Sequence, residues 1–218
     1  MQPSHAFRRR AGFSFIEILV VMGIIALLAG LGVVVVQIAS RRGPESSTKA
    51  LVMKLKGYVD AWKLRFNDYP PMQLSEIGKR AESSKEIKAA DVTNHTNEPV
   101  EALYQAIYWP GFATDVEINE ETETSNLDDD QLRTAPTSRG TALRELKDAY
   151  GNPVYYFVNT MYAKSEQAPP TYDNVRHGEV QPKPWREPGG GFVNPNGFQI
   201  FSAGEDGLPN TDDDIKSW

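Results

Sequence analysis

The most apolar part of the chain lies near its beginning, between Phe13 and Ala39. Within it, Ile18–Ile38 contains a single polar side chain, Gln37. At a helical rise of about 1.5 Å per residue, this stretch spans roughly 30 Å, which is the thickness of the hydrocarbon core of a bilayer. The pattern therefore predicts a transmembrane helix over residues 13–39.

A second helical pattern follows this segment. Gly43-Pro44 predicts a kink or a break, and Glu45–Thr48 supplies the acidic and capping residues that often begin a helix. Large apolar residues then recur every three or four positions, which places them on one helical face. These residues are Leu51, Leu55, Tyr58, Trp62 and Phe66. We expect an amphipathic helix that packs on a sheet and ends in the turn at residues 67–71.

The C-terminal half has strand-like patterns instead. β-branched and aromatic residues cluster in Val154–Val158 and Phe198–Ser202, which predicts two strands that pair antiparallel. Leu143–Tyr150 predicts a short helix, followed by a turn at residues 151–153. Together these patterns predict an α+β fold, in which a long N-terminal helix packs on a small C-terminal antiparallel sheet.

The segments between these elements carry weaker patterns. Lys79–Ala90 predicts a short exposed helix, Val100–Tyr108 is apolar enough to dock on the core, and Thr160–Asn196 predicts a long loop. Glu117–Asp130 is strongly acidic and predicts a mobile loop. Its last three residues, Asp128–Asp130, fit either a bound cation or a solvated run of charge. The second interpretation is favoured, because no glycine turn organises the run.

Charge divides the chain into two parts. Residues 1–42 hold five arginines against one carboxylate, Glu17, while the rest is acidic enough to give the whole chain a formal net charge of −6. An acidic surface repels nucleic acid phosphates, so no nucleic acid partner is expected, whereas cation binding suits it. The chain has no cysteine, which excludes disulfides and thiolate metal sites.

Enzymatic chemistry is not indicated. The three histidines, His5, His95 and His177, have no metal-ligand or catalytic-triad context in the sequence. Neither a G-x-S-x-G nucleophile motif nor a phosphate-binding P-loop occurs. The sequence therefore predicts a structural or binding protein, and a membrane-anchored hydrolase is the alternative from another class.

The last residues combine glycine turns with carboxylates. Glycines flank Glu205-Asp206 on both sides, so the Asp206 carboxylate can fold back toward Asp212–Asp214. Calcium takes about six to eight oxygen ligands from carboxylates and backbone carbonyls. Because the segment contains no histidine or cysteine, zinc and copper are disfavoured. We expect a calcium loop over residues 202–218; an unstructured acidic tail is the alternative, which Ile215 and Trp218 disfavour.

A carboxylate, Glu17, stands at the head of the apolar segment. A charge inside a membrane helix costs about 2.5–3.5 kcal/mol unless it is paired, so this residue is expected to have a function. A cleaved secretory signal is one interpretation, but the apolar segment is too long for it. An ordinary signal anchor is another, with a cytoplasmic N-terminus because of Arg8–Arg10.

The third interpretation accounts for more of these residues. The segment from Gly12 to Glu17 closely resembles the type IV prepilin processing motif, in which a glycine precedes an aromatic residue and a glutamate is the fifth residue of the processed chain. The resemblance implies that a prepilin peptidase cuts after Gly12, removes residues 1–12 as a leader and methylates the new N-terminus at Phe13. Ala11 departs from the family, which usually has a basic residue there.

The same motif indicates how subunits would assemble. Four residues of helix separate Glu17 from the Phe13 amine by about 6 Å along the helix axis. A subunit that adds with an axial stagger can therefore pair its carboxylate with a neighbour's amine. Such a pair would favour docking and set the register of a filament.

Two further segments resemble the major pseudopilin of type II secretion systems. Leu146–Pro153 resembles the Asp-Pro-Trp-Gly-Asn-Pro segment of that family, and the glycine- and aspartate-rich end of the chain resembles its calcium loop. The resemblance implies calcium as the cofactor, with ligands carried over by position. The side-chain ligands would be Asp206, Asp213 and Asp214, the backbone ligands Ala203 and Leu208, and Asp212 a replacement or extra ligand.

The resemblance also implies a location and a function. Residues 13–39 would cross the inner membrane once, and residues 40–218 would form a pilin-like globular domain in the periplasm. Identical subunits, together with minor pseudopilins, would form a pseudopilus on an inner-membrane platform driven by a cytoplasmic ATPase. This filament would push exported proteins through the outer membrane. The alternatives are a type IV pilin for adhesion, motility or DNA uptake, and a minor pseudopilin.

Overall fold

The chain divides into two compact units, residues 1–42 and 43–218. The structure, a computed structural model, describes residues 15–80, 87–109, 112, 116–133 and 141–218, with side chains for all of them except 29–42 and 78–80. The expected leader, together with Gly12 and Phe13 of the processing motif, lies outside the described residues.

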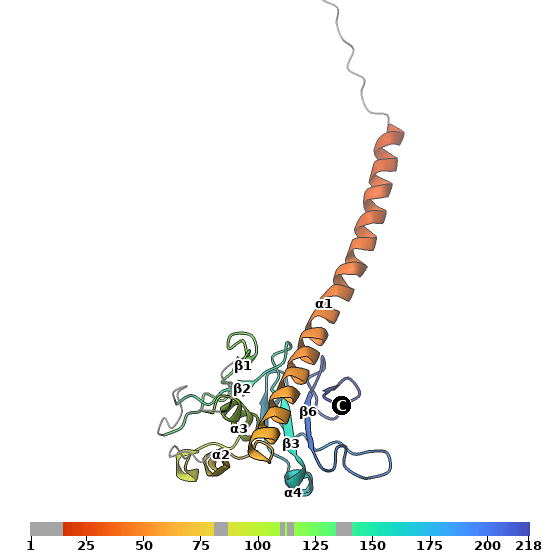
Figure 1. Cartoon of the computed structure of the whole chain (residues 1–218). Helices are drawn as coiled ribbons and strands as arrows, with labels where there is room; N and C mark the ends of the chain where they lie inside the picture. The colour runs from red at the N-terminus through yellow and green to blue at the C-terminus, as the bar shows by residue number, and fades with distance from the viewer. Residues whose placement is uncertain (1–14, 81–86, 110–111, 113–115, 134–140) are drawn as a thin grey trace, which may run out of the picture. The chain divides into compact units, whose positions relative to one another are not determined.

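A single long helix, α1 (Phe15–Phe66), occupies the first part of the described chain (Figure 1). Pro44 lies inside this helix, so of the two expectations for Gly43-Pro44, a kink or a break, the break is wrong, and so is a separate helix start at Glu45–Thr48. A proline in a helix interior removes one backbone hydrogen bond. The helical turns before and after it continue, which makes α1 one element.

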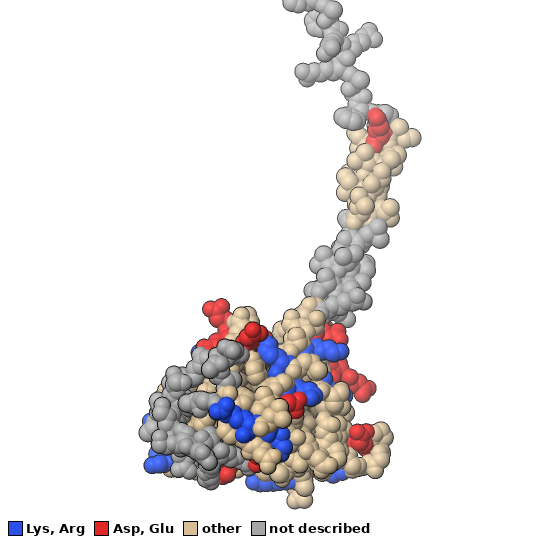
Figure 2. Space-filling model, viewed as in Figure 1, with Lys and Arg blue, Asp and Glu red and all other residues tan. Residues whose placement is uncertain are grey.

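The large apolar side chains of residues 15–28 are all more than half exposed, from Ile24 at 52% to Phe15 at 80%. In Figure 2 this stretch is tan apart from one acidic side chain. The expected transmembrane segment extends beyond it, into residues whose side chains are not described. Within the described residues, no helix has an apolar stretch of the length and hydropathy that crossing a membrane requires.

The second unit has the predicted α+β composition. Its three-stranded sheet consists of β3 (Tyr155–Val158), β6 (Phe198–Ser202) and β7 (Ile215–Lys216), with β6 in the centre. β3 and β6 are antiparallel, with Tyr155 opposite Phe201, which confirms the pairing expected from the sequence. β7 pairs antiparallel with the C-terminal end of β6, so the residues between these two strands form a closed loop.

The remaining elements of the second unit are short (Figure 1). Two strand pairs stand outside the main sheet: β1 (Thr124–Ser125) with β2 (Glu145–Leu146), and β4 (Tyr172–Asn174) with β5 (Gly178–Val180). The helices are α2 (Leu74–Arg80), η1 (Ala89–Asp91), α3 (Glu98–Ile107), η2 (Asn159–Met161) and α4 (Tyr162–Gln167). The long loop expected over residues 160–196 therefore contains regular structure.

The hydrophobic core joins the C-terminal part of α1, α3 and the main sheet in one cluster. Leu51, Leu55 and Val59 of α1 are buried in it, and a second cluster surrounds Trp62. Leu51, Leu55 and Trp62 confirm the amphipathic face predicted for α1, on which Tyr58 and Phe66 are half-buried. α3 is buried along its whole length, as expected for a segment that docks on the core.

The helix expected over Leu143–Tyr150 is wrong, because β2 lies there. Both β2 side chains are buried, and Glu145 accepts a hydrogen bond from the Leu127 amide at 3.1 Å. Pairing with β1 and burial outweigh the local preference for a helix. Of the short helix expected over residues 79–90, residues 79–80 are the end of α2, residues 81–86 lie outside the described residues, and residues 89–90 belong to the 3₁₀ turn η1.

Candidate functional site

Glu17 lies in the first turn of α1 and is exposed. The Gly12-Phe13 junction lies outside the described residues. Over residues 15–28 the structure shows one acidic group, Glu17, on an otherwise apolar helical surface. Such a surface favours burial in lipid or against other helices, and its carboxylate then needs a cationic partner.

The C-terminal acidic loop links β6 to β7 and is shaped by glycine. Gly204 has a φ of +67°, and a Cβ placed on it would lie 2.4 Å from the Asp213 carbonyl oxygen. Any residue type with a Cβ at position 204 would clash with the Asp213 backbone. Glycine at this position therefore brings the two ends of the loop together, beside the buried Ala203.

The loop carboxylates are used to hold the loop together. The Asp206 amide donates to Asp213 Oδ2 at 3.1 Å, and the Leu208 amide donates to Asp206 Oδ1 at 2.7 Å. The Asn210 amide donates to Asp214 Oδ2 at 2.9 Å. Each of the three aspartates thus satisfies a backbone amide, which is the usual way in which aspartate stabilises a turn.

Several of the expected calcium ligands converge on one hydroxyl group. Thr211 Oγ1 lies 3.1 Å from the Leu208 carbonyl oxygen, 2.6 Å from Asp213 Oδ1 and 3.5 Å from Asp214 Oδ1. A hydroxyl has one hydrogen, so it can donate to only one of these acceptors at a time. The structure therefore gathers three of the expected ligand oxygens around a single point, and Asp212 is not among them.

The two inner aspartates of the loop titrate differently. Burial raises the pKa of Asp214 to about 7, although the Asn210 amide and other donors oppose the shift. Burial also acts on Asp213, but hydrogen bonds from the Thr211 hydroxyl and from backbone amides outweigh it and lower the pKa of that carboxyl. At neutral pH the loop thus holds one firmly ionised carboxylate beside one that is easily protonated.

Residues far away in the sequence support the loop. Asn174 Nδ2 donates to the Gly207 carbonyl at 2.9 Å, and Trp185 Nε1 donates to Asp214 Oδ2 at 3.2 Å. The Ser202 hydroxyl donates to Asp148, whose carboxylate also organises the turn that contains Gly151. Sequence reasoning missed these supporting residues, because nothing local marks them as neighbours of the loop.

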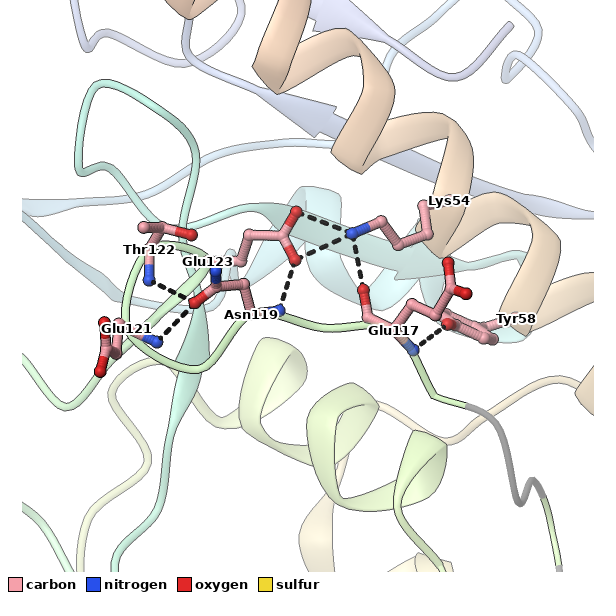
Figure 3. A network of polar contacts seen from close by, with 7 residues as sticks. All are labelled: Lys54, Tyr58, Glu117, Asn119, Glu121, Thr122 and Glu123. Carbon is pink, nitrogen blue, oxygen red and sulfur yellow. Dashed lines mark hydrogen bonds and ion pairs between the residues drawn. The ribbon is translucent and has the colours of Figure 1, made fainter.

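The acidic segment before β1 is not a free loop. Lys54 Nζ contacts both Glu123 carboxylate oxygens, at 2.7 and 2.9 Å, and also donates to the Glu117 carbonyl (Figure 3). The Asn119 side chain accepts hydrogen bonds from the amides of Glu121 and Thr122. These contacts fasten the segment to α1.

The expectation that Asp128–Asp130 is a solvated run of charge is wrong for its two outer members. Asp130 is buried and Asp128 partly buried, while Asp129 is exposed. The Asn126 side chain exchanges hydrogen bonds at 3.2 Å with both the amide and the carbonyl of Asp130. Asp129 has a φ of 53°, which supplies the turn that the sequence, lacking a glycine here, did not indicate.

Asp128 and Asp130 lie close to Glu101 of α3, and one carboxylate oxygen from each of the three lies within 4.8 Å of the others. Among the described residues, this is the one group of three acidic or histidine side chains with its ligand atoms so close together. The loop aspartates do not form such a group. Sequence reasoning missed Glu101, and it also missed Glu145 of β2, which is fully buried nearby.

Comparison with protein families gives a match at the N-terminus only. Residues 7–33 match the prokaryotic N-terminal methylation motif, which includes Gly12, Phe13 and Glu17. Neither the curated proteins nor the solved structures gave a match. The motif, together with the α+β fold that follows a long N-terminal helix, indicates a type IV pilin-like protein.

Proposed function

We propose that this chain is a structural subunit of a type II secretion pseudopilus, anchored in the inner membrane, and not an enzyme. The observation that carries the proposal is the methylation motif at residues 7–33, which leads into an apolar helical surface. A prepilin peptidase would process the chain. Identical subunits and minor pseudopilins would then assemble on an inner-membrane platform, with the domain of residues 43–218 in the periplasm.

The exposed apolar side chains of residues 15–28 support anchoring followed by bundling. A helix that is apolar on all sides is normally covered by lipid or by protein. In the proposed cycle, lipid covers this surface before assembly, and the helices of neighbouring subunits cover it in the filament.

Glu17 supports an ordered addition of subunits. It lies four residues after Phe13, whose amine becomes the N-terminus when the chain is cut after Gly12. A carboxylate within lipid costs about 2.5–3.5 kcal/mol. Pairing with the amine of a neighbouring subunit removes this cost and fixes the axial stagger between the two helices.

The C-terminal loop favours a major pseudopilin over a type IV pilin for adhesion, motility or DNA uptake, and over a minor pseudopilin. Oxygens from Leu208, Asp213 and Asp214 converge there around Thr211, which supports calcium as a cofactor of the loop. Weak calcium sites, with Kd values on the order of 10⁻⁴–10⁻³ M, are typical of extracytoplasmic modules, because calcium is plentiful there.

Processing is tested by intact-mass analysis after co-expression with a prepilin peptidase. The mass should fall by that of residues 1–12 and rise by one methyl group. Gly12→Val should block cleavage, because the peptidase requires glycine at this position in the family that the motif resembles. A mature chain that begins near Gly30 would indicate an ordinary signal peptide instead.

Assembly is tested with Glu17→Ala. Insertion into the membrane should be unchanged or better, because a costly charge is removed, whereas the yield of sheared or cross-linked filaments should fall more than about tenfold if the charge pair drives docking. Glu45→Ala, which removes an exposed carboxylate elsewhere on α1, is the matched control. Normal polymerisation of the Glu17 variant would exclude the pairing with the Phe13 amine.

The choice between secretion and the other filament functions is tested in a strain that lacks the gene. Loss of an exported enzyme from the medium, with surface motility and DNA uptake intact, is the expected result, and the gene should restore it. Loss of motility or of DNA uptake with normal export would overturn the assignment to type II secretion and leave a type IV pilin.

A further inference from the structure

A buried group of carboxylates in the second unit takes no part in the proposed function. Glu101 comes from α3, while Asp128 and Asp130 come from the segment between β1 and β2. Glu101 is fully buried and Asp130 is 8% exposed. One oxygen of each of the three lies within 4.8 Å of the others, so three negative groups share one small volume.

Most oxygens of this group have no hydrogen-bond donor. Both carboxylate oxygens of Glu101, both of Asp130 and Oδ1 of Asp128 are buried and accept no hydrogen bond. The last oxygen, Asp128 Oδ2, accepts one from Asn94 Nδ2 at 2.8 Å. Buried polar atoms in folded proteins nearly always have a partner, so a concentration of orphaned acceptors at one place requires an explanation.

The surrounding charges do not supply that partner. Burial raises the pKa of Glu101 well above its usual value, and the neighbouring carboxylates Asp130, Asp128, Glu145 and Glu98 raise it further. Within the described part of the chain, no lysine or arginine forms an ion pair with Glu101, Asp128 or Asp130. A buried charge of this kind is either neutralised by a proton or balanced by a counter-ion.

The geometry suits a counter-ion. Ligand oxygens on opposite sides of one calcium ion are about 5 Å apart, because each lies at about 2.3–2.6 Å from the metal. Two further buried oxygens without a partner lie on the adjoining elements. Gln105 Oε1 belongs to the residue one helical turn beyond Glu101, and Ser125 Oγ to the residue that pairs with Glu145 across β1 and β2.

We propose that Glu101, Asp128 and Asp130 bind a calcium ion at a second site, separate from the C-terminal loop. The ligands are oxygens only, which selects a hard cation over zinc or copper. Calcium tolerates irregular shells of protein oxygens, whereas magnesium demands a near-ideal octahedron and keeps its waters. The ion joins α3 to the segment that carries Asp130, and so clamps a domain that has no disulfide.

The test measures calcium binding to the full-length protein in detergent by equilibrium dialysis, with calcium alone as the probe. Asp213→Asn, which alters the C-terminal loop, serves as the background. This background should bind one ion per chain, and Glu101→Gln added to it should abolish that binding or weaken it more than about tenfold. In chelator, the added Glu101→Gln should leave the melting temperature equal or higher, because glutamine keeps the volume and carries no charge.

Asp129→Asn in the same background is the matched control, since it removes an exposed carboxylate between two buried ones, and it should leave the bound ion in place. Two results would overturn the proposal: an Asp213→Asn protein that binds no calcium, or one whose calcium stoichiometry and affinity are unchanged by Glu101→Gln. Equal displacement of calcium by an equal concentration of magnesium would overturn the assignment to calcium.

Discussion

The C-terminal loop and the buried acidic group both gather carboxylates, yet the protein treats these carboxylates differently. In the loop, Asp206, Asp213 and Asp214 each accept a hydrogen bond from a backbone amide of the same loop. In the buried group, Glu101 and Asp130 accept none. The number of aspartates in a stretch of sequence therefore says little about its need for a cation; what matters is whether the fold supplies donors to them.

The two regions therefore differ in how much the repulsion between their carboxylates destabilises the fold when no counter-ion is bound. Asp206 and Asp213 are exposed and Asp214 is buried, but all three accept a hydrogen bond from a backbone amide of the loop, so the loop can keep its shape alone. Two full negative charges about 5 Å apart in the buried group would repel each other by about 3 kcal/mol, at an effective dielectric constant near 20. A counter-ion should therefore matter more to the buried group than to the loop.

The largest effect is expected where the loop depends on glycine. Gly204→Ala places a Cβ 2.4 Å from the Asp213 carbonyl at a φ of +67°, so it should lower the free energy of unfolding by more than about 2 kcal/mol. Gly207→Ala is the matched variant, because its φ is also positive but its Cβ meets side-chain atoms only, at 3.3 Å or more. It should cost about 1–2 kcal/mol. Chemical denaturation measures both, and equal costs would show that the close approach to Asp213 is not needed.

A second test measures how the stability of the fold depends on pH, and asks how much of this dependence comes from the buried acidic group. Burial, and then Asp128, raise the pKa of Asp130 from 3.8 to about 7. A carboxyl whose pKa is raised by folding contributes stability below its unfolded pKa, and this contribution is lost as pH rises through about 7. In chelator, wild-type protein should therefore become less stable between about pH 4 and pH 8.

Asp130→Asn should make this fall in stability shallower, while Glu145 and Asp214, whose pKa values are also raised to about 7, still contribute to it. At pH 8 in chelator it should raise the stability by about 1–3 kcal/mol, because it replaces a buried charge with a neutral group of the same shape. Asp129→Asn should do neither. Melting curves at each pH measure the difference. A parallel fall of the wild-type and Asp130→Asn curves would show that this carboxyl does not carry the pH dependence.

The sequence predicted the elements whose pattern is local. The spacing of Leu51, Leu55 and Trp62 indicated the buried face of α1, and the aromatic runs indicated β3 and β6. The gathering of Asp206 with Asp213 could also be expected, because glycines flank the first of them. These features depend on residues within a few positions of one another.

The buried acidic group could not be predicted, because its parts become neighbours only in the fold. Glu101 has the position of a polar residue on an amphipathic helix, yet it is fully buried because α3 is enclosed on all sides. Asp130 turns inward through the left-handed Asp129 and the side chain of Asn126, and no glycine marks this turn in the sequence. The support of Asp214 by Trp185 is likewise a contact over a long sequence distance.

The smallest effect is expected for calcium at the C-terminal loop, measured in the Glu101→Gln background so that the buried group does not contribute. A ligand that binds only the folded state stabilises it by RT ln(1 + [L]/Kd), which is about 2.7 kcal/mol at a hundredfold excess. With a Kd on the order of 10⁻⁴–10⁻³ M, 10 mM calcium should add about 1.4–2.7 kcal/mol. The lower end is expected, because Asp206 and Asp213 already accept amide hydrogen bonds that calcium would have to rearrange.

Asp206→Ala and Asp213→Ala should each remove this gain in melting temperature, whereas Asp129→Ala should preserve it. Asp212→Ala is the informative intermediate: Asp212 is not among the groups that contact the Thr211 hydroxyl, so a loss of the gain in this variant would mean that the loop closes further around the ion than it does here. Thr211→Val removes the hydroxyl on which Leu208 and Asp213 converge. It should weaken the loop in chelator but leave most of the calcium gain, because the ion then takes the place of the hydroxyl. No change in melting temperature with calcium in the Glu101→Gln protein would rule out the loop site, and with it the main reason to prefer a major pseudopilin over a type IV pilin.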